Sequence, residues 1–343
     1  MRIGVMTGGG DCQGLNAAIQ AIVRKATEYG FEVYGVSRGY KGLIEGDLKQ
    51  LSLGDVEGIF HVGGTILGTS RINPFKTKEG IERVKENFKK FGLDALIIIG
   101  GGDTLGVANK LYDMGIPIIG VPKTIDNDLL ETDYCLGFQT AVEIAADAIT
   151  RLHTTAKSHD RVVIVEIMGR YSGWLTLMAG LAGGAHIILI PEEPFDIESI
   201  CKVIEEREKK GKTYTIIAVA EGAKPENLGD FITVTREKDD FGHVRLGGIA
   251  RVLEKEISKR TGKSTRSVIL GHVQRGGPPN SYDRILGIRL GLSAVELAKE
   301  GMFGYATVLK GTEIVSVKLG KVVEKMRAVD KELIKLTKFY LPM

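Results

Sequence analysis

Three kinds of feature are scarce or absent in this 343-residue chain, and each absence excludes a class of protein. Its only cysteines, Cys12, Cys135 and Cys201, are too few and too widely spaced for a disulfide framework or a zinc motif, which favours a reducing cytoplasm. No apolar run approaches the roughly 20 residues of a membrane-spanning helix, and an expected strand at Arg2–Thr7 leaves no room for a signal peptide. The net charge of +3 is too small to favour nucleic acid. We therefore expect a cytoplasmic protein without a membrane or nucleic-acid partner.

Short apolar runs alternate with helical patterns along most of the chain, which is typical of an α/β fold with parallel strands. The expected strands are Ile3–Met6, Glu32–Ser37, Ala95–Ile99, Ile116–Val121, Arg161–Glu166, His186–Ile190, Tyr214–Val219 and Ser267–Leu270. The expected helices are Asn16–Tyr29, Glu79–Phe91, Leu105–Met114, Thr140–Thr154, Ser172–Leu181, Ile197–Lys209, Ile249–Thr261 and Tyr282–Glu300. We predict two doubly wound, Rossmann-like domains with a cleft between them. A polar insertion at about 223–245, with acids at Asp239 and Asp240, is expected to form a surface hairpin or lid.

The most informative segment is Pro122-Lys123-Thr124-Ile125-Asp126-Asn127-Asp128, directly after the apolar run Ile116–Val121. Carboxylates can hold a metal ion and accept a proton from an alcohol, while a lysine neutralises phosphate oxygens. Asp126 and Asp128 alternate in what we expect to be an extended segment, so their side chains are expected to point the same way. A polar turn after a buried strand explains Asn127, but not Lys123 and Asp126 together. The segment therefore favours a phosphoryl-transfer site.

Glycine-rich turns follow two other expected strands, at Gly8–Asp11 and Gly100–Thr104. Glycines let backbone amides approach an anion at the start of a helix, although neither turn is a Walker A motif. A simple tight turn is an equal alternative for Gly8–Asp11. Asp103 is alternatively the N-cap of its helix.

Arginine ends two further expected strands, in Met168-Gly169-Arg170 and in the segment 272–277. Its guanidinium binds phosphate in a bidentate way, which predicts a site for a second phosphate. Arg161 and Arg266 instead begin the strands that precede those turns. They therefore suit the pocket of a neighbouring subunit better than their own, with a surface charge as the alternative. Arg71, after a glycine-rich turn, is either a clamp for donor phosphates or a solvated loop residue.

Together these segments resemble the 6-phosphofructokinase family from Arg2 to about Glu300, and most of all its pyrophosphate-dependent members. The matches are Gly8–Asn16, Gly63–Arg71, Gly100–Thr104, Pro122–Asp128, Ser158–Arg170, Glu221, Arg266 and Gly271–Arg284. The resemblance implies a transferase: reversible transfer of a phosphoryl group from pyrophosphate to the C1 hydroxyl of fructose 6-phosphate, a step of glycolysis that gives fructose 1,6-bisphosphate. It also implies a homodimer or homotetramer with shared active sites.

The resemblance further implies a role for each matched residue. Asp126 is the general base, and Lys123 and Asp103 also act in catalysis. The implied sugar-phosphate ligands are Thr124, Ile125, Asp126, Arg161, Met168, Gly169, Arg170, Glu221, Arg266, His272, Val273, Gln274 and Arg275. The implied donor ligands are Gly9, Arg71, Gly101, Gly102, Asp103 and Thr104. Residues 1–137 with about 279–327 are then the donor domain, and residues 138–278 the sugar-phosphate domain.

The predicted donor depends on Asp103, because ATP-using members of the family usually have glycine there. Two negative charges about 4 Å apart cost roughly 4 kcal/mol at an effective dielectric near 20, or about three decades in affinity. A carboxylate at this position is expected to repel the α-phosphate of ATP, which pyrophosphate lacks. An ATP-dependent 6-phosphofructokinase is the nearest alternative. A non-catalytic sugar-phosphate-binding protein is a more distant one.

The resemblance implies Mg²⁺ as the cofactor, but Gly102 stands where the family has Asp or Glu for the metal. We therefore expect Asp103 and Asp128 to hold the ion between them. Gln20 and His153 replace arginines of the effector pocket of the allosteric bacterial members, which argues against control by ADP or phosphoenolpyruvate. Residual use of ATP and acceptance of sedoheptulose 7-phosphate stay open.

Overall fold

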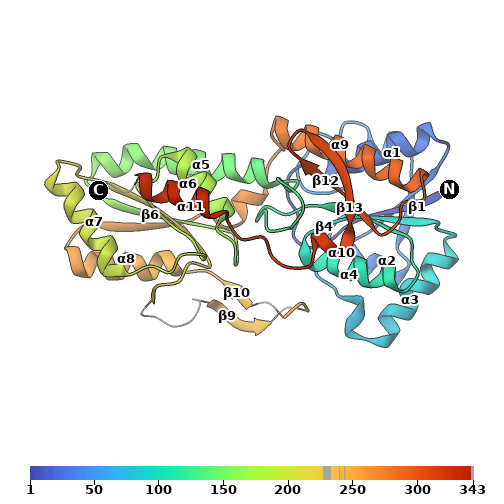
Figure 1. Cartoon of the computed structure of the whole chain (residues 1–343), viewed down its shortest axis with the longest axis horizontal. Coiled ribbons are helices and arrows are strands. Elements are labelled where there is room, and N and C mark those ends of the chain that lie inside the picture. Colours follow the sequence, from blue (N-terminus) through green and yellow to red (C-terminus); the bar gives the residue numbers. More distant parts are fainter. Residues whose placement is uncertain (227–232, 239, 243, 341–343) are drawn as a thin grey trace. The chain divides into compact units, whose positions relative to one another are not determined.

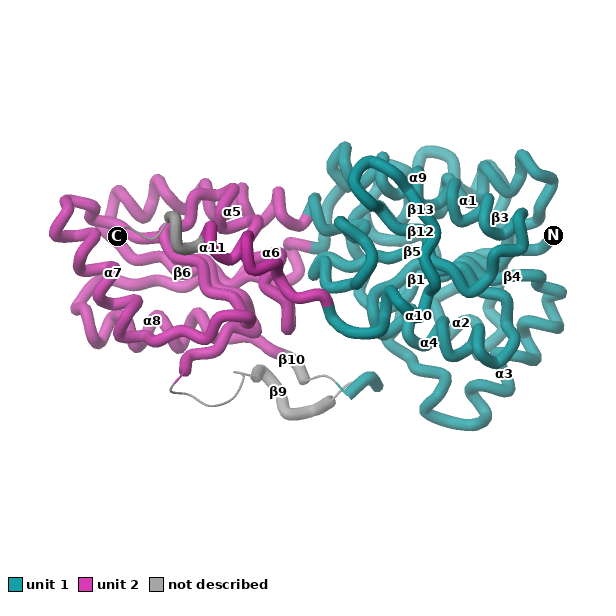
Figure 2. Tube along the Cα trace, in the orientation of Figure 1, with its two compact units in different colours: residues 1–140, 239–243, 275–326 teal, residues 141–238, 244–274, 327–343 magenta. Residues whose placement is uncertain are grey.

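The computed structural model describes residues 1–226, 233–238, 240–242 and 244–340. The chain divides into two compact units, coloured separately in Figure 2. Unit 1 comprises residues 1–140, 239–243 and 275–326, and unit 2 comprises residues 141–238, 244–274 and 327–343. Each unit has its own sheet (Figure 1). Each also has its own apolar core. The expected cleft between two domains stays a prediction.

Unit 1 is built on a seven-stranded sheet with the order β13-β12-β5-β4-β1-β2-β3. Its strands are β1 (Arg2–Thr7), β2 (Glu32–Val36), β3 (Leu48–Leu51), β4 (Ala95–Gly100), β5 (Ile118–Pro122), β12 (Tyr305–Lys310) and β13 (Glu313–Lys318). The strands β4 and β5 are buried along their whole length, as expected for apolar runs at the centre of a parallel sheet. Within the described part of this sheet, antiparallel pairing is limited to its two edges, where β3 pairs with β2 and β13 pairs with β12.

Helices cover both faces of this sheet (Figure 1). They are α1 (Leu15–Glu28), α2 (Tyr40–Glu45), α3 (Lys78–Lys90), α4 (Gly102–Asp113), α9 (Ser281–Lys299) and α10 (Leu319–Val322). On one face α1 packs directly against α9, and on the other lie α2, α3, α4 and α10. Gly291 allows the close approach of α9 to α1, because a Cβ there would lie 2.6 Å from the carbonyl oxygen of Ala18.

Unit 2 contains a four-stranded parallel sheet with the order β11-β6-β8-β7. Its strands are β6 (Val162–Ile167), β7 (Ile187–Leu189), β8 (Thr215–Ala220) and β11 (Thr265–Ile269). Figure 1 shows α5 (Phe138–Ser158), α6 (Trp174–Gly183) and α11 (Lys331–Tyr340) on one face, and α7 (Ile197–Lys209) and α8 (Ile249–Thr261) on the other. The helix α5 begins in unit 1 and continues into unit 2.

The structure confirms every expected strand and helix, with ends shifted by a few residues. It also confirms a hairpin in the insertion, where β9 (Thr233–Lys238) pairs antiparallel with β10 (Val244–Leu246). Asp239 lies outside the described residues, as do residues 227–232 and 243. The sequence reading missed β3, β12, β13, α2, α10 and α11. Two of the missed strands, β3 and β13, add antiparallel edges to the expected parallel sheet. Within the described ranges, no helix has the length and apolar character needed to span a membrane.

Candidate active site

The turn after β1, Gly8–Asp11, is held by side chains that donate to all four of its carbonyl oxygens. The Lys123 ammonium donates to Gly8, at 3.0 Å, and to Gly10. Thr69 Oγ1 donates to Gly9 at 2.6 Å, and Arg275 Nε donates to Asp11 at 2.9 Å. Two cations therefore lie against the negative ends of the loop's peptide dipoles. This makes the loop a more favourable neighbour for an anion.

Lys123 lies immediately after β5 and is only 3% exposed. Its ammonium has three N–H donors, and the contacts to Gly8 and Gly10 use two of them. Burial lowers the pKa of Lys123, and nearby Arg275 contributes to the lowering, while Asp11 and Asp126 oppose it. The group is thus a buried cation that links the end of β5 to the Gly8–Asp11 loop.

Glycine is required in this region because side chains occupy the space that a Cβ would take. A Cβ at Gly8 would lie 2.5 Å from Thr104 Cγ2, and one at Gly100 would lie 2.4 Å from the same atom. A Cβ at Gly10 would lie 2.0 Å from Arg275 Nη2. Gly9 has a φ of 78°, a left-handed conformation that favours glycine. The glycines of both turns thus allow close packing around the buried Thr104 and Arg275.

Asp103 lies in the first turn of α4, and Gly101 is the N-cap residue, with no side chain capping the helix. The alternative interpretation of Asp103 as the N-cap is therefore wrong. Asp103 is exposed, and its carboxylate stands at the positive end of the helix dipole. Helix starts of this kind bind phosphate in many proteins, so Asp103 places a fixed negative charge where such an anion would bind.

The segment after Lys123 forms a turn at Ile125-Asp126, so the expectation of an extended segment is wrong. Asn127 has a φ of 51°, a left-handed conformation that asparagine tolerates better than most residues. Its buried side chain holds this geometry, because it accepts from the Cys135 amide at 2.8 Å and donates to the Asp133 carbonyl at 3.1 Å. A left-handed residue between Asp126 and the next carboxylate breaks the two-residue alternation on which their common direction depended.

Other predicted residues of unit 1 shape the same turns. Thr124 Oγ1 accepts a hydrogen bond from the Asp126 amide at 3.1 Å, and Ile125 is buried at 6% exposure. Arg71 is exposed on the loop that follows Gly68. That loop contacts the Gly8–Asp11 turn, since Gly9 donates to the Ser70 carbonyl at 3.2 Å.

The segment after β11 is a short 3-10 helix, Gly271–Arg275, with two exposed and two buried side chains. His272 and Val273 are exposed, whereas Gln274 is fully buried and donates to the Gly271 carbonyl at 3.0 Å. Arg275 is 8% exposed, and its Nη2 lies 2.9 Å from a carboxylate oxygen of Asp11. Arg275 belongs to unit 1, as does the Gly8–Asp11 loop. This predicted phosphate ligand is therefore held in place by its ion pair with Asp11.

In unit 2 the turn after β6, Met168–Arg170, has an unusual backbone. Gly169 has a φ of 146° and Arg170 a φ of 41°, which is uncommon for an arginine. The Glu221 carboxylate, after β8, accepts from the amides of Gly169 at 3.4 Å and Arg170 at 3.0 Å. A Cβ at Gly222 would lie 1.8 Å from the Arg170 carbonyl oxygen. The two neighbouring strands β6 and β8 thus bring these predicted sugar ligands together.

Arg161 and Arg266 lie at the opposite end of the same sheet. Thr265 pairs with Val162 in the parallel β6–β11 register, so both arginines stand at the amino ends of neighbouring strands. The six residues of β6 lie between Arg161 and Met168, so the two are about 23 Å apart along the strand, at roughly 3.3 Å per residue. The position of Arg161 and Arg266 at the amino ends of the strands makes them poor candidates for the same pocket as Met168–Arg170 of their own subunit.

A family model described as "Phosphofructokinase" matches residues 2–298. This chain belongs to the phosphofructokinase family. It is 54% identical, over 97% of both chains, to the pyrophosphate–fructose 6-phosphate 1-phosphotransferase of Amycolatopsis methanolica. It is also 51% identical, over 96% of both chains, to the ATP-dependent 6-phosphofructokinase 3 of Streptomyces coelicolor. The solved phosphofructokinase of Pichia pastoris is similar with a TM-score of 0.83 and 32% identity, over 99% of this chain and 36% of that longer chain.

No complete metal cage is found in the described part of this chain: it holds no cluster of three or more His, Cys, Asp or Glu side chains. Mg²⁺ does not require such a cage, because it is usually held by one or two carboxylates together with substrate phosphates and waters. The carboxylates of Asp103 and Asp128 fit that donor set in chemistry and in exposure. A Cβ at Gly102 would lie 3.6 Å from Leu129 Cδ2, its nearest neighbour. This is an ordinary van der Waals contact, so close packing does not require glycine at this position.

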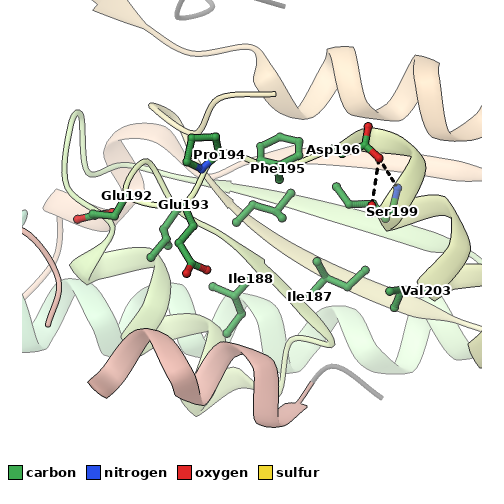
Figure 3. Close-up of a pocket in the computed structure, with 12 residues that line it drawn as sticks. Ile187, Ile188, Glu192, Glu193, Pro194, Phe195, Asp196, Ser199 and Val203 are labelled. Carbon is green, nitrogen blue, oxygen red and sulfur yellow. Dashed lines mark hydrogen bonds between the residues drawn. The ribbon is translucent and has the colours of Figure 1, made fainter. Parts of the chain in front are cut away.

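A cavity of about 560 Å³ lies in unit 2, beside the edge strand β7 and the start of α7 (Figure 3). Its lining is largely apolar, including Ile187, Ile188, Phe195 and Val203. Figure 3 shows Glu193 directed toward Ile188, and Asp196 bonded to Ser199 at the helix start. None of the predicted site residues lines this cavity.

Proposed function

We propose that this chain is a pyrophosphate-dependent 6-phosphofructokinase, which transfers a phosphoryl group reversibly to the C1 hydroxyl of fructose 6-phosphate. The observation that carries the choice of donor is the position of Asp103 in the first turn of α4. Curated relatives at 51% identity include both a pyrophosphate-dependent and an ATP-dependent enzyme, so overall similarity does not select the donor.

Electrostatics supports pyrophosphate. The start of α4 is a natural anion site, and a fixed carboxylate there disfavours a further phosphate by roughly 4 kcal/mol at about 4 Å and an effective dielectric near 20. Pyrophosphate has no third phosphate to meet this charge. Lys123, which donates to the carbonyl oxygens of Gly8 and Gly10, adds a positive charge for the phosphate that leaves.

In the proposed mechanism, Asp126 accepts the proton of the C1 hydroxyl as its oxygen forms a bond to phosphorus. The bridging P–O bond of pyrophosphate breaks, and inorganic phosphate leaves with the electron pair. Lys123 stabilises the charge that develops on the phosphate oxygens. The donor ligands are proposed to be Gly9, Arg71, Gly101, Gly102, Asp103 and Thr104. When bound, Mg²⁺ would neutralise phosphate charge, and Asp103 and Asp128 would hold it.

The sugar phosphate is proposed to bind Thr124, Ile125, Met168, Gly169, Arg170, Glu221, His272, Val273, Gln274 and Arg275. Arg161 and Arg266 are proposed to act on the site of a neighbouring subunit, since they lie at the far end of the sheet from Met168–Arg170. This supports a homodimer or homotetramer with shared active sites. Residues 1–137 and about 279–327 would then serve the donor, and 138–278 the sugar. The absence of disulfides among the described cysteines suits the proposed cytoplasmic location.

The donor assignment is tested by measuring initial rates with pyrophosphate and with ATP at equal free Mg²⁺. We expect kcat/KM to be at least about a thousandfold higher with pyrophosphate. The variant Asp103→Gly should lower this preference by raising the rate with ATP. Equal or better use of ATP by the natural enzyme would show that the ATP-dependent alternative is correct.

The role of Asp126 has its own test, the variant Asp126→Ser. Turnover should fall by several decades, while fructose 6-phosphate still binds in calorimetry, because the hydroxyl of serine cannot hold the proton that the carboxylate accepts. Turnover near the natural value would refute the assignment of Asp126 as general base.

A further inference from the structure

The guanidinium of Arg275 is hydrogen-bonded to Asp11, an acidic residue that was not among the predicted ligands. Nε donates to the carbonyl oxygen of Asp11 at 2.9 Å, and Nη2 donates to its carboxylate oxygen Oδ1, also at 2.9 Å. The side chain of Arg275 is 10% exposed and that of Asp11 is 45% exposed. The pair is thus anchored in unit 1 on the arginine side and open to solvent on the carboxylate side.

These contacts leave one edge of the guanidinium available. An arginine has five N–H donors, one on Nε and two on each Nη atom. Asp11 engages Nε and one N–H of Nη2, which is the side edge of the group. The end edge, formed by Nη1 and the other N–H of Nη2, keeps the parallel pair of donors that binds a phosphate in a bidentate way. Asp11 therefore fixes the direction of the guanidinium without occupying its phosphate-binding edge.

The surroundings favour this position of the Arg275 guanidinium against Asp11. Gly10 leaves room for the guanidinium where a Cβ would lie 2.0 Å from Nη2. The charge of Asp11 also balances the two nearby cations, since it opposes the lowering of the Lys123 pKa by burial and by Arg275. Without the carboxylate, two cations near one loop would repel each other, and the arginine would lose half of its fixed contacts.

We propose that Asp11 is a positioning residue that holds Arg275 ready for the 6-phosphate of the sugar. This inference rests on the proposed function, because Arg275 is a sugar-phosphate ligand only in that context. It extends the site to a residue of the Gly8–Asp11 loop. Fixing the arginine before the phosphate arrives lowers the entropy that binding must remove.

The test is direct binding of fructose 6-phosphate, measured by calorimetry without any phosphoryl donor, in the full-length natural enzyme and the variants Asp11→Ala, Arg275→Ala and the double variant. We expect Asp11→Ala to weaken binding by about tenfold or more, the range for a lost hydrogen bond to a charged group. Asp11→Asn, which keeps an oxygen acceptor, should weaken it less. In the double variant the loss should equal that of Arg275→Ala alone, because Asp11 acts through the arginine.

A matched control is Asp147→Ala, which removes another Asp–Arg pair, to Arg151 at 2.6 Å on α5; both side chains are exposed, and neither residue is among the predicted ligands. It should leave binding unchanged. Thermal melting with and without inorganic phosphate confirms that each variant is folded. Losses that add independently in the double variant, or an Asp11→Ala variant that binds the sugar phosphate normally, would overturn the inference. Failure of the natural enzyme to bind fructose 6-phosphate would instead refute the proposed function.

Discussion

The turns after β1 in unit 1 and after β6 in unit 2 are stabilised through opposite backbone groups. In the first, donors from Lys123, Thr69 and Arg275 bind the carbonyls of Gly8–Asp11. In the second, the Glu221 carboxylate binds the amides of Gly169 and Arg170. One turn is thus organised by cations and the other by an anion.

The two turns also differ in backbone strain. Only glycine has a positive φ in the first turn, whereas the second holds Arg170 at a φ of 41°. A non-glycine residue in this region costs of order 1–3 kcal/mol and persists only where neighbouring groups enforce it. We therefore expect the conformation of the first turn to depend on the buried charge of Lys123. The conformation of the second turn should depend on the close packing of Gly222 against the Arg170 carbonyl oxygen.

The largest effect is expected from removing the buried charge with Lys123→Met. Methionine is similar in length and suits an apolar environment, but it cannot donate to Gly8 and Gly10. We expect turnover to fall by about a thousandfold or more, since the loop loses its main donor and the phosphate its cation. Steady-state kinetics measures the loss, and binding of fructose 6-phosphate should change much less. A variant with near-normal turnover would show that the charge does not organise the first turn.

A smaller effect is expected in unit 2 from Gly222→Ala. The added Cβ would lie 1.8 Å from the Arg170 carbonyl, so the strained turn must move. Such overpacking costs about 1–3 kcal/mol, which corresponds to a rise in KM for fructose 6-phosphate of about 5-fold to about 150-fold. KM for pyrophosphate should stay constant.

Gly106→Ala, within α4 and outside all predicted ligand sets, is the matched control for that change. A Cβ at Gly106 would have no atom of a neighbouring segment within 4 Å, and the residue has no positive φ. Kinetics like those of the natural enzyme are expected. If both alanines raised KM for the sugar equally, the contrast between a tightly packed and an open glycine would be lost.

The sequence predicted the central strands, because long buried runs such as Ala95–Gly100 leave few other choices. It did not predict the edge strands β3 and β13, whose short, half-exposed patterns resemble loops. The sequence also placed Lys123 and Asp103 after the ends of strands. It did not predict the left-handed φ of Asn127, because that conformation depends on contacts with Asp133 and Cys135 that form only in the folded chain. The pairing of Asp11 with a residue 264 positions away is likewise a tertiary contact with no local signal.

The smallest effect concerns a partly buried basic group of unit 2, His186. Its Nδ1 accepts a hydrogen bond from the Ile216 amide at 2.8 Å. Burial, together with the nearby charge of Arg207, lowers the pKa of His186 from 6.5 to about 3. Between those values the unfolded chain binds a proton that the folded chain does not, so stability should fall as the pH decreases below 6.5. The effect is limited because the ring is partly exposed to solvent.

The variant His186→Asn keeps an acceptor for the Ile216 amide but cannot take up a proton. The difference in urea unfolding midpoint between pH 7.5 and pH 5 should therefore be smaller in this variant than in the natural protein. Lys123 is present in both proteins, so whatever its lowered pKa contributes to the pH dependence of stability cancels in this comparison. An identical pH dependence in both proteins would show that His186 is not the group that makes unit 2 sensitive to acid.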